Sequence, residues 1–173
     1  AILQPPFFDA NGDDAYNYGG IGAVIGHEMI HGYDDQGSRF GPTGNFEDWW
    51  TPADTEGFKG RTARLVDQFD GYEALPALKV NGKLTLGENI ADLGGLNVAL
   101  DAYHKALKDA GKDGAAKVDG YSGDQRFFLG FGTIWRDQMT DDLMKLIVAS
   151  NEHAPGKFRA IAAPSNMPAF AQA

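Results

Sequence analysis

The sequence predicts a mainly α-helical fold with a small amount of β structure. In residues 86–109 the apolar side chains recur at helical spacing over more than six turns. A second helical stretch, residues 16–34, carries two histidines four positions apart. The Asn81-Gly82 pair between short apolar runs indicates a turn or hairpin. With 173 residues, 43% of them hydrophobic, the chain is long enough for one domain, spanning 1–173, with a real core.

The amino-terminal quarter predicts an extended segment followed by a helix. Residues 1–8 are apolar but contain Pro5-Pro6, which forbids both helix and central strand, so we expect them to run extended. The helix begins near Tyr16 and continues to about Asp34. This helix carries a stripe of glycines at spacings of three and four: Gly19, Gly22 and Gly26. Because each glycine costs about 1 kcal/mol in a helix interior, the stripe predicts that another backbone packs closely against it.

The middle of the chain predicts a loop, a helix and a turn. Residues 36–45 hold four glycines or prolines and form the loop. Thr51 can cap a helix with Pro52 at its first position, and the helical pattern continues to about Phe69. The Asn-Gly pair then predicts a small hairpin or turn over residues 79–84.

The second half predicts more helices. The long helix over residues 86–109 is interrupted by Gly94-Gly95, and we expect these glycines to face the glycine stripe of the first helix. The segments that follow are a surface loop, two helices and a turn, namely residues 110–122, 125–138, 141–150 and 155–157.

Composition excludes several classes of protein. A net charge of −9 argues against nonspecific nucleic-acid binding, which needs a basic face. Because the chain has no cysteine, any metal must be held by histidine and carboxylate groups. No run of about eighteen apolar residues is present and the amino terminus lacks the layout of a signal peptide, so we expect neither a membrane span nor an export signal within the chain.

The histidine pair belongs to a metal-binding pattern. If residues 16–34 are helical, His27 and His31 lie on one face and can reach the same tetrahedral zinc ion. Glu28 then lies beside them, free to take a proton from water. The alternative is a buried helix with two hydrogen-bonded histidines.

A catalytic zinc site needs a third protein ligand, and Glu88 is the best candidate. Asp92 follows one turn later on the same helix face, so one carboxylate can bind the metal while the other accepts the free N–H of a ligand imidazole. Taken alone, each has a simpler explanation: Glu88 as a first-turn carboxylate favoured by the helix dipole, and Asp92 on a solvated face.

Residues 24–34, 87–92 and 151–159 together resemble the neprilysin and endothelin-converting enzyme family of zinc metallopeptidases. The likeness runs from Ile2 to Pro168. It implies a thermolysin-like (gluzincin) helical catalytic subdomain with one Zn²⁺ per chain, acting as an endopeptidase on oligopeptides. By the resemblance, the zinc ligands are His27, His31 and Glu88, and the general base is Glu28. Asp92 and Asp34 are the partners of the ligand histidines. His153 stabilises the transition state, and Arg159 binds a substrate carbonyl.

The resemblance also implies a specificity pocket. Phe7, Val24, Ile134 and Trp135 match positions that line it, and the pocket prefers a bulky hydrophobic residue just after the cleaved bond. The alternative for these side chains is ordinary core packing. His104 matches nothing in the family, and we expect it on a solvent-facing helix position.

The family carries a large helical capping domain ahead of this region, so we expect the chain to be the catalytic part of a longer two-domain metallopeptidase, truncated at both ends. The expected partners are a peptide substrate and the missing amino-terminal capping domain, and an exposed apolar face predicts self-association. We expect export to the periplasm or the exterior, with a possible membrane anchor outside the chain. The alternative function is a zinc-binding but catalytically incompetent module for peptide binding or assembly.

Overall fold

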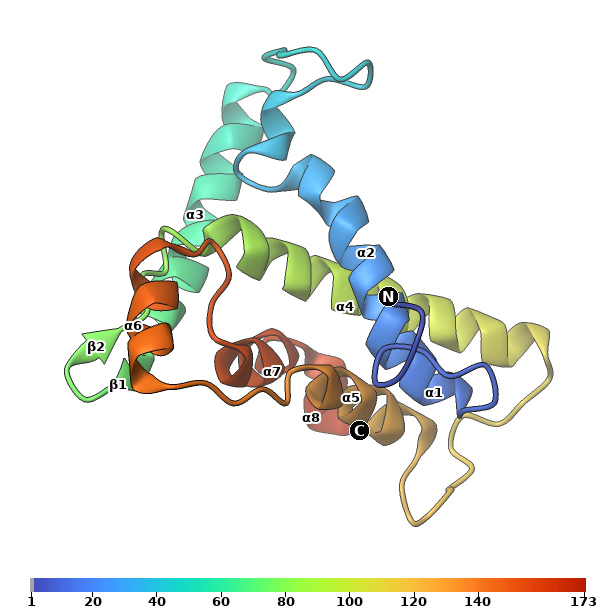
Figure 1. The fold of residues 1–173 in the computed structure, drawn as a ribbon. Coiled ribbons are helices and arrows are strands. Elements are labelled where there is room, and N and C mark those ends of the chain that lie inside the picture. The colour runs from blue at the N-terminus through green and yellow to red at the C-terminus, as the bar shows by residue number, and fades with distance from the viewer. Residues whose placement is uncertain (1) are drawn as a thin grey trace.

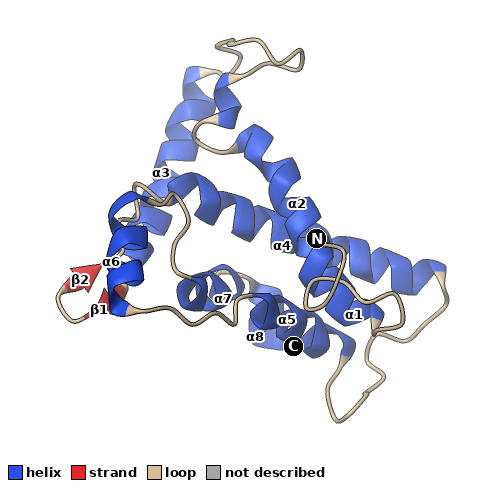
Figure 2. Ribbon diagram, viewed as in Figure 1, coloured by secondary structure: helices blue, strands red, loops and turns tan. Residues whose placement is uncertain are grey.

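The computed structural model describes residues 2–173 and is dominated by helices, with two short strands in one hairpin (Figure 2). The predicted mainly α fold with minor β is therefore confirmed. Within the described residues, no helix is both long enough and apolar enough to cross a membrane.

The helices and strands follow one another with short connections. The first six elements are α1 (Asp14–Asn17), the π-helical turn η1 (Tyr18–Gly22), α2 (Ala23–Ile30), the 3₁₀ turns η2 (His31–Tyr33) and η3 (Gly37–Arg39), and α3 (Pro52–Asp70). The remaining elements are β1 (Glu73–Leu75), β2 (Leu78–Lys79), α4 (Leu86–Asp109), α5 (Gly123–Ile134), α6 (Asp141–Ser150), α7 (Gly156–Ser165) and α8 (Pro168–Gln172).

Helix α4 runs through the middle of the molecule, and α2 crosses it on one side while α5, α7 and α8 lie on the other (Figure 1). The expected helix from about Tyr16 to Asp34 is a continuous helical path from α1 to η2. It starts at Asp13, whose side chain accepts a hydrogen bond from the Ala15 N–H. Its irregular part is η1, a π-helical turn of the kind that is frequent near functional sites.

Glycines allow α2 and α4 to approach closely. A Cβ on Gly26 would lie 2.5 Å from the carbonyl oxygen of Gly95, so two glycine backbones meet at the crossing as predicted. Gly19 instead packs against the backbone of Phe127 on α5. The stripe prediction is wrong for Gly22, since the nearest atom to a Cβ there lies at 3.6 Å, an ordinary contact distance.

Two hydrophobic clusters form the core of the described residues; α7 contributes to both, and the larger one supports the α2–α4 crossing. The larger cluster joins α1, α2, α4, α5 and α7, and its members are Ala15, Ala23, Leu96, Ala99, Leu100, Tyr103, Phe127, Phe128, Phe131, Ala163 and Met167. The smaller cluster joins α3, the hairpin, α6 and α7, and its members are Phe69, Ala74, Val80, Val148, Ala154, Phe158 and Ala162.

The amino-terminal segment is a turn, so the predicted extended conformation is wrong. The Phe7 and Phe8 N–H groups both donate to the Gln4 carbonyl, at 3.0 and 3.1 Å. Proline excludes helix and central strand but is well suited to a turn. The turn places the Phe7 carbonyl where it accepts the Ile21 N–H at 2.8 Å, which docks the segment on η1.

The predicted hairpin lies slightly earlier in the chain than expected. β1 and β2 pair antiparallel with Glu73 opposite Lys79, and the connection is made by Pro76 and Ala77, the latter with φ of 62°. The Asn-Gly pair forms a turn as expected, but it leads into α4, and the Gly82 N–H donates to Asp70 Oδ1 at 2.6 Å. A hydrogen bond to the end of α3 therefore places this turn at the start of α4 and not inside the hairpin.

The carboxyl-terminal region differs most from the sequence-based expectation. Helix α5 ends at Ile134 instead of residue 138, and Gly156, which we expected in a turn, begins α7. Gly156 lies against the carbonyl oxygen of Trp135, with a closest approach of 2.9 Å for an added Cβ. The tail beyond it, which shows no readable pattern, forms α7 and α8 by packing on both clusters.

Candidate metal centre

Two histidines and one glutamate converge where α2 meets the first turn of α4. Their potential ligand atoms all lie within 4.8 Å of one another. His27 Nε2 lies 2.9 Å from His31 Nε2, and the two nitrogens lie 3.2 and 3.6 Å from the Glu88 carboxylate oxygens. The helical spacing of His27 and His31 puts both rings on one face, and the glycine contact brings Glu88 within reach of them.

Each histidine is oriented by a carboxylate on its other ring nitrogen. Asp92 Oδ1 lies 2.9 Å from His27 Nδ1, and Asp34 Oδ2 lies 2.7 Å from His31 Nδ1. Because a carboxylate only accepts hydrogen bonds, both Nδ1 atoms are the protonated ones. The two Nε2 lone pairs then face each other at 2.9 Å, so either a proton or a metal ion must lie between them.

The donor set fits zinc. Tetrahedral zinc binds nitrogen and oxygen at about 2.0–2.2 Å, which spaces its ligands by about 3.3–3.5 Å. The three separations in the structure, 2.9, 3.2 and 3.6 Å, bracket that value. Glu88 Oε2 is buried and has no hydrogen-bond partner among the described residues, although His27 and His153 nitrogens lie at 3.2 and 2.9 Å. These short contacts lack hydrogen-bond geometry, and a cation would satisfy the oxygen.

The electrostatics of the site favour a bound cation. Burial acts to lower the pKa of His27, but the hydrogen bond to Asp92, the close contact with the Glu88 carboxylate and the charge of Asp92 outweigh it and raise the pKa to about 9. Burial acts to raise the pKa of Asp92, and the hydrogen bonds from Arg159 and His27 overcome it, so the pKa is lowered. The metal-free site therefore holds a proton on His27 at neutral pH, which zinc would displace.

Glu28 lies next to His27 on α2 and is exposed. Within residues 2–173 no hydrogen bond or ion pair engages its carboxylate. An exposed carboxylate without a hydrogen-bond or ion-pair partner, beside a metal site, can accept a proton from water. A hollow of about 350 Å³ lined by His31 and Glu88, among other residues, opens beside the ligands.

His153 approaches the ligands from the loop between α6 and α7. Its Nε2 lies 2.9 Å from Glu88 Oε2, and its Nδ1 lies 3.0 Å from Asn151 Oδ1, which also accepts the His153 backbone N–H at 2.8 Å. Burial, together with Arg159 and against the charge of Glu88, lowers the pKa of His153.

Asn151 was not among the residues predicted from the sequence. Its position two residues before a histidine is a signal that could have found it, because Asn side chains commonly bind the backbone N–H two residues later.

Arg159 on α7 is buried and binds Asp92 through two hydrogen bonds, from Nε and Nη2, each 2.7 Å long. Its guanidinium carbon lies 4.0 Å from the centre of the Trp135 ring, and Nη2 is 3.7 Å from Glu88. Asp92 thus stands between His27 and Arg159 and links α2, α4 and α7.

The predicted pocket residues come from three places around the centre. Phe7 lies in the amino-terminal turn, Val24 one turn before His27, and Ile134 and Trp135 at the end of α5. All four are half-buried, and the last two pack against the larger cluster. Their role in specificity stays a prediction.

His104 is exposed on α4, as expected, with Nε2 at 2.7 Å from Asp124 Oδ1.

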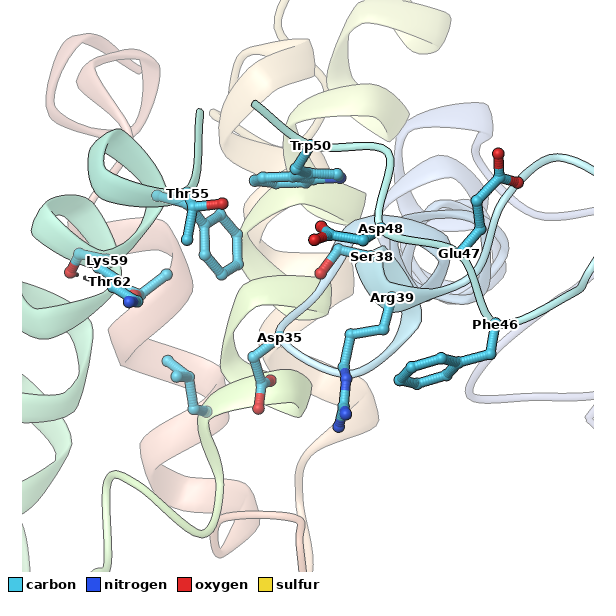
Figure 3. A pocket seen from close by; sticks show the side chains of 12 residues that line it. Asp35, Ser38, Arg39, Phe46, Glu47, Asp48, Trp50, Thr55, Lys59 and Thr62 are labelled. Carbon is cyan, nitrogen blue, oxygen red and sulfur yellow. Dashed lines mark hydrogen bonds between the residues drawn. The ribbon is translucent and has the colours of Figure 1, made fainter. Parts of the chain in front are cut away.

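Another hollow of about 520 Å³ lies between α3 and the loop after η3 (Figure 3). Trp50 and Phe58 provide aromatic walls, while Arg39 and Lys59 add positive charge. None of the candidate zinc ligands lines it. The donor chemistry at the α2–α4 crossing, and not the size of a cavity, therefore marks the candidate functional centre.

A helix with two histidines and an adjacent glutamate, packed on a second helix that supplies another glutamate, defines a class: the helical catalytic subdomain of thermolysin-like zinc metallopeptidases. The sequence model of peptidase family M13 matches residues 1–173, and the chain belongs to this family.

Known relatives resemble the chain over nearly its whole length. It is 42% identical over 172 residues to neprilysin-11 of Caenorhabditis elegans, covering 98% of this chain and 20% of that protein. It is 39% identical over 171 residues to human endothelin-converting enzyme 1, covering 99% of this chain and 22% of that protein. The crystal structure of Mycobacterium tuberculosis zinc metalloprotease Zmp1 in complex with an inhibitor superposes with a TM-score of 0.93 at 45% identity, covering 99% of this chain and 27% of that one. The chain thus spans about a fifth to a quarter of these relatives.

Proposed function

We propose that the chain is the catalytic part of a zinc-dependent endopeptidase that hydrolyses oligopeptides on the amino side of bulky hydrophobic residues. The observation that carries the proposal is the convergence of His27, His31 and Glu88 beside an unengaged Glu28. Membership of peptidase family M13 and the likeness to a zinc metalloprotease support it.

In this proposal, His27, His31 and Glu88 hold one zinc ion. When bound, zinc supplies a Lewis acid that lowers the pKa of water. Glu28 accepts the proton of the water that attacks the peptide carbonyl, and later gives it to the leaving amine. His153, when both of its ring nitrogens are protonated, donates a hydrogen bond from Nε2 to the carbonyl oxygen as it becomes negative, an interaction whose loss typically costs about 2.7–4 kcal/mol.

Arg159 binds a substrate carbonyl in this proposal. Asp92 takes the Nε N–H and one Nη2 N–H, so the donors that remain for the substrate are the second Nη2 N–H and the two on Nη1. Phe7, Val24, Ile134 and Trp135 form the proposed hydrophobic pocket.

The proposed partners are a peptide substrate and the additional domains of a longer protein, since the relatives matched are about four to five times as long. Export from the cytoplasm stays a prediction.

The decisive experiment compares Glu28→Gln with Glu56→Gln in the purified protein, using peptides that carry a single bulky hydrophobic residue. Glu56 is exposed on α3, away from the site, so this variant is a matched control. We expect Glu28→Gln to lower kcat by about 10²–10⁴-fold, the usual contribution of a general base, while zinc content stays at one per chain. A chelator should abolish hydrolysis, and Glu56→Gln should match the wild type.

The alternative function, a zinc-binding module without catalysis, predicts stoichiometric zinc and peptide binding with no turnover. The unengaged Glu28 favours the peptidase. Full activity in Glu28→Gln would contradict the proposed mechanism, and a zinc-loaded protein that cleaves no peptide in its longest natural form would support the alternative.

A further inference from the structure

Trp135 lies directly after α5, where its indole ring faces the Arg159 guanidinium. The guanidinium carbon lies 4.0 Å from the ring centre, within the range of a cation–π contact. The indole Nε1 is buried and has no hydrogen-bond partner among the described residues. Packing, including an edge contact with Phe131 at 5.8 Å between ring centres, therefore holds the ring in place.

The ring is connected to a candidate zinc ligand through two intermediates. Arg159 donates two hydrogen bonds of 2.7 Å to Asp92, and Asp92 lies 2.9 Å from Nδ1 of His27. A paired arrangement of this kind requires the guanidinium plane to match that of the carboxylate. An aromatic ring against one face of the guanidinium limits its rotation out of that plane.

The alignment of the guanidinium with the carboxylate matters because both side chains are buried. Arg159 and Asp92 are 7% and 4% exposed, so water cannot replace a hydrogen bond that is lost through misalignment. A displaced Arg159 would pull Asp92 away from His27 or leave it partly unpaired, and either change alters the presentation of His27 Nε2 to a metal.

We propose that Trp135 is a positioning residue of the metal centre: its ring holds Arg159 in the orientation that binds Asp92, and Asp92 in turn orients His27. This proposal rests on the zinc-binding part of the proposed function. It differs from a role in lining a substrate pocket, because it affects zinc binding in the absence of any peptide.

The test is a double-mutant cycle read out as the zinc dissociation constant of the purified protein. Residues that orient metal ligands typically contribute about 10–100-fold in metal affinity, and Trp135 acts two contacts further away than Asp92 does. We therefore expect Trp135→Leu to weaken zinc binding about three- to tenfold, and Trp135→Phe to restore most of that loss. In an Arg159→Met background, Trp135→Leu should change the dissociation constant by less than about twofold, because the residue through which it acts is gone.

Phe128→Leu is the matched control. It removes a buried ring from α5, the helix that Trp135 follows, within the hydrophobic cluster against which Trp135 packs, and Phe128 contacts Phe127 and Phe170 instead of Arg159. We expect it to lower the melting temperature but leave zinc affinity within about twofold of the wild type. Equal losses from Trp135→Leu in both backgrounds, or equal losses from Trp135→Leu and Phe128→Leu, would overturn the proposal.

A second measurement uses the zinc-free protein. The indole ring current should shift the NMR signals of the Arg159 side chain, and Trp135→Leu, unlike Phe128→Leu, should move those signals and the His27 ring signals together. A His27 ring that is unaffected would also overturn the proposal. A wild-type protein that binds zinc and responds as expected but hydrolyses no peptide would instead contradict the proposed function alone.

Discussion

Three side chains that are not candidate ligands determine how the histidines are presented. Asp34 and Asp92 accept from the Nδ1 atoms of His31 and His27, and the Asn151 amide oxygen lies at 3.0 Å from Nδ1 of His153. At His27 and His31 the hydrogen bond places a proton on Nδ1 and directs Nε2 toward the other candidate ligands, and at His153 it fixes the orientation in which Nε2 faces the site. A single residue two or three positions away, or on another helix, thus orients each imidazole.

Replacement of Asn151 tests this arrangement at His153. We expect Asn151→Leu, which keeps similar volume but removes the amide, to lower kcat about tenfold, because an oriented donor to the carbonyl oxygen is worth about 2.7–4 kcal/mol and misorientation forfeits part of it. Steady-state kinetics and zinc titration measure the effect, and zinc affinity should stay within about twofold. Exposed Asn97 on α4 offers Asn97→Leu as the control. An unchanged kcat would show that His153 does not depend on Asn151.

Replacement of Val24 tests the predicted specificity pocket. Val24 is half-buried one turn before His27. We expect Val24→Phe to reduce kcat/KM for substrates with a large hydrophobic residue after the cleaved bond by about 10-fold or more, and to spare substrates with alanine there, because a filled pocket rejects large side chains. Competition between paired peptides gives the ratio directly. An unchanged preference would remove Val24 from the pocket.

At the scale of helices, the α2–α4 crossing decides whether a site exists. The histidines and Glu88 belong to different helices, and their separation depends on two backbones in contact at Gly26 and Gly95. Side chains at these positions would force the helices apart. The helix propensity lost at each glycine is therefore offset by the close approach it permits.

The substitutions Gly26→Ala and Gly57→Ala should have opposite effects on stability. A Cβ at Gly26 would lie 2.5 Å from the Gly95 carbonyl oxygen, whereas at Gly57 on α3 no atom lies within 4 Å. We expect Gly26→Ala to destabilise by about 1–3 kcal/mol through overpacking and to weaken zinc binding. Gly57→Ala should stabilise by about 0.5–1 kcal/mol because alanine is the better helix former. Urea unfolding measures both changes, and a stable Gly26→Ala protein with unaltered zinc affinity would argue against a tight crossing.

At the scale of the whole molecule, a bound zinc ion would link α2 to α4 and stabilise the fold. Free zinc at 100 times its dissociation constant stabilises a protein that binds it only when folded by about 2.7 kcal/mol. For a chain of this size we expect removal of zinc to lower the melting temperature by about 5–10 °C. Calorimetry with and without a chelator tests this, and Glu88→Gln should abolish most of the difference. A chelator that leaves the melting temperature unchanged would contradict a structural contribution from the metal.

The exposed face of α2 and η2 carries a second prediction at this scale. Ile25, Met29 and Tyr33 follow one another at intervals of four residues and are 56%, 62% and 58% exposed. An apolar stripe of this kind promotes association, so we expect the chain to self-associate, and Met29→Glu to reduce it. Sedimentation velocity over a range of concentrations tests this. A monomer at all concentrations would show that the stripe is tolerated in water.

The sequence predicted the helices well where local signals agreed. Thr51 caps α3 through a capping box with Asp54, as the Thr-Pro pair indicated, and the apolar stripe of residues 86–109 coincides with α4. Predictions were wrong where a distant contact decided the outcome. Asp70 binds the Gly82 N–H and turns the Asn-Gly pair into the entry of α4, and α7 forms around contacts that no local pattern reveals.

The sequence by itself determined that His27 and His31 share a helix face with Glu28 beside them, because helical spacing is a local property of the chain. It also indicated Glu88 and Asp92, through the need for a third ligand and their spacing of one helical turn, and His153, through a resemblance whose motifs follow in order along the chain. Only the tertiary structure decided that these groups meet, that Asn151 orients His153, and that Trp135 lies against Arg159 behind Asp92. The physical reason is that most of these contacts join residues far apart in sequence. They arise from the packing of α2, α4, α5 and α7 around shared hydrophobic clusters. The conformational preference of any one segment does not produce them.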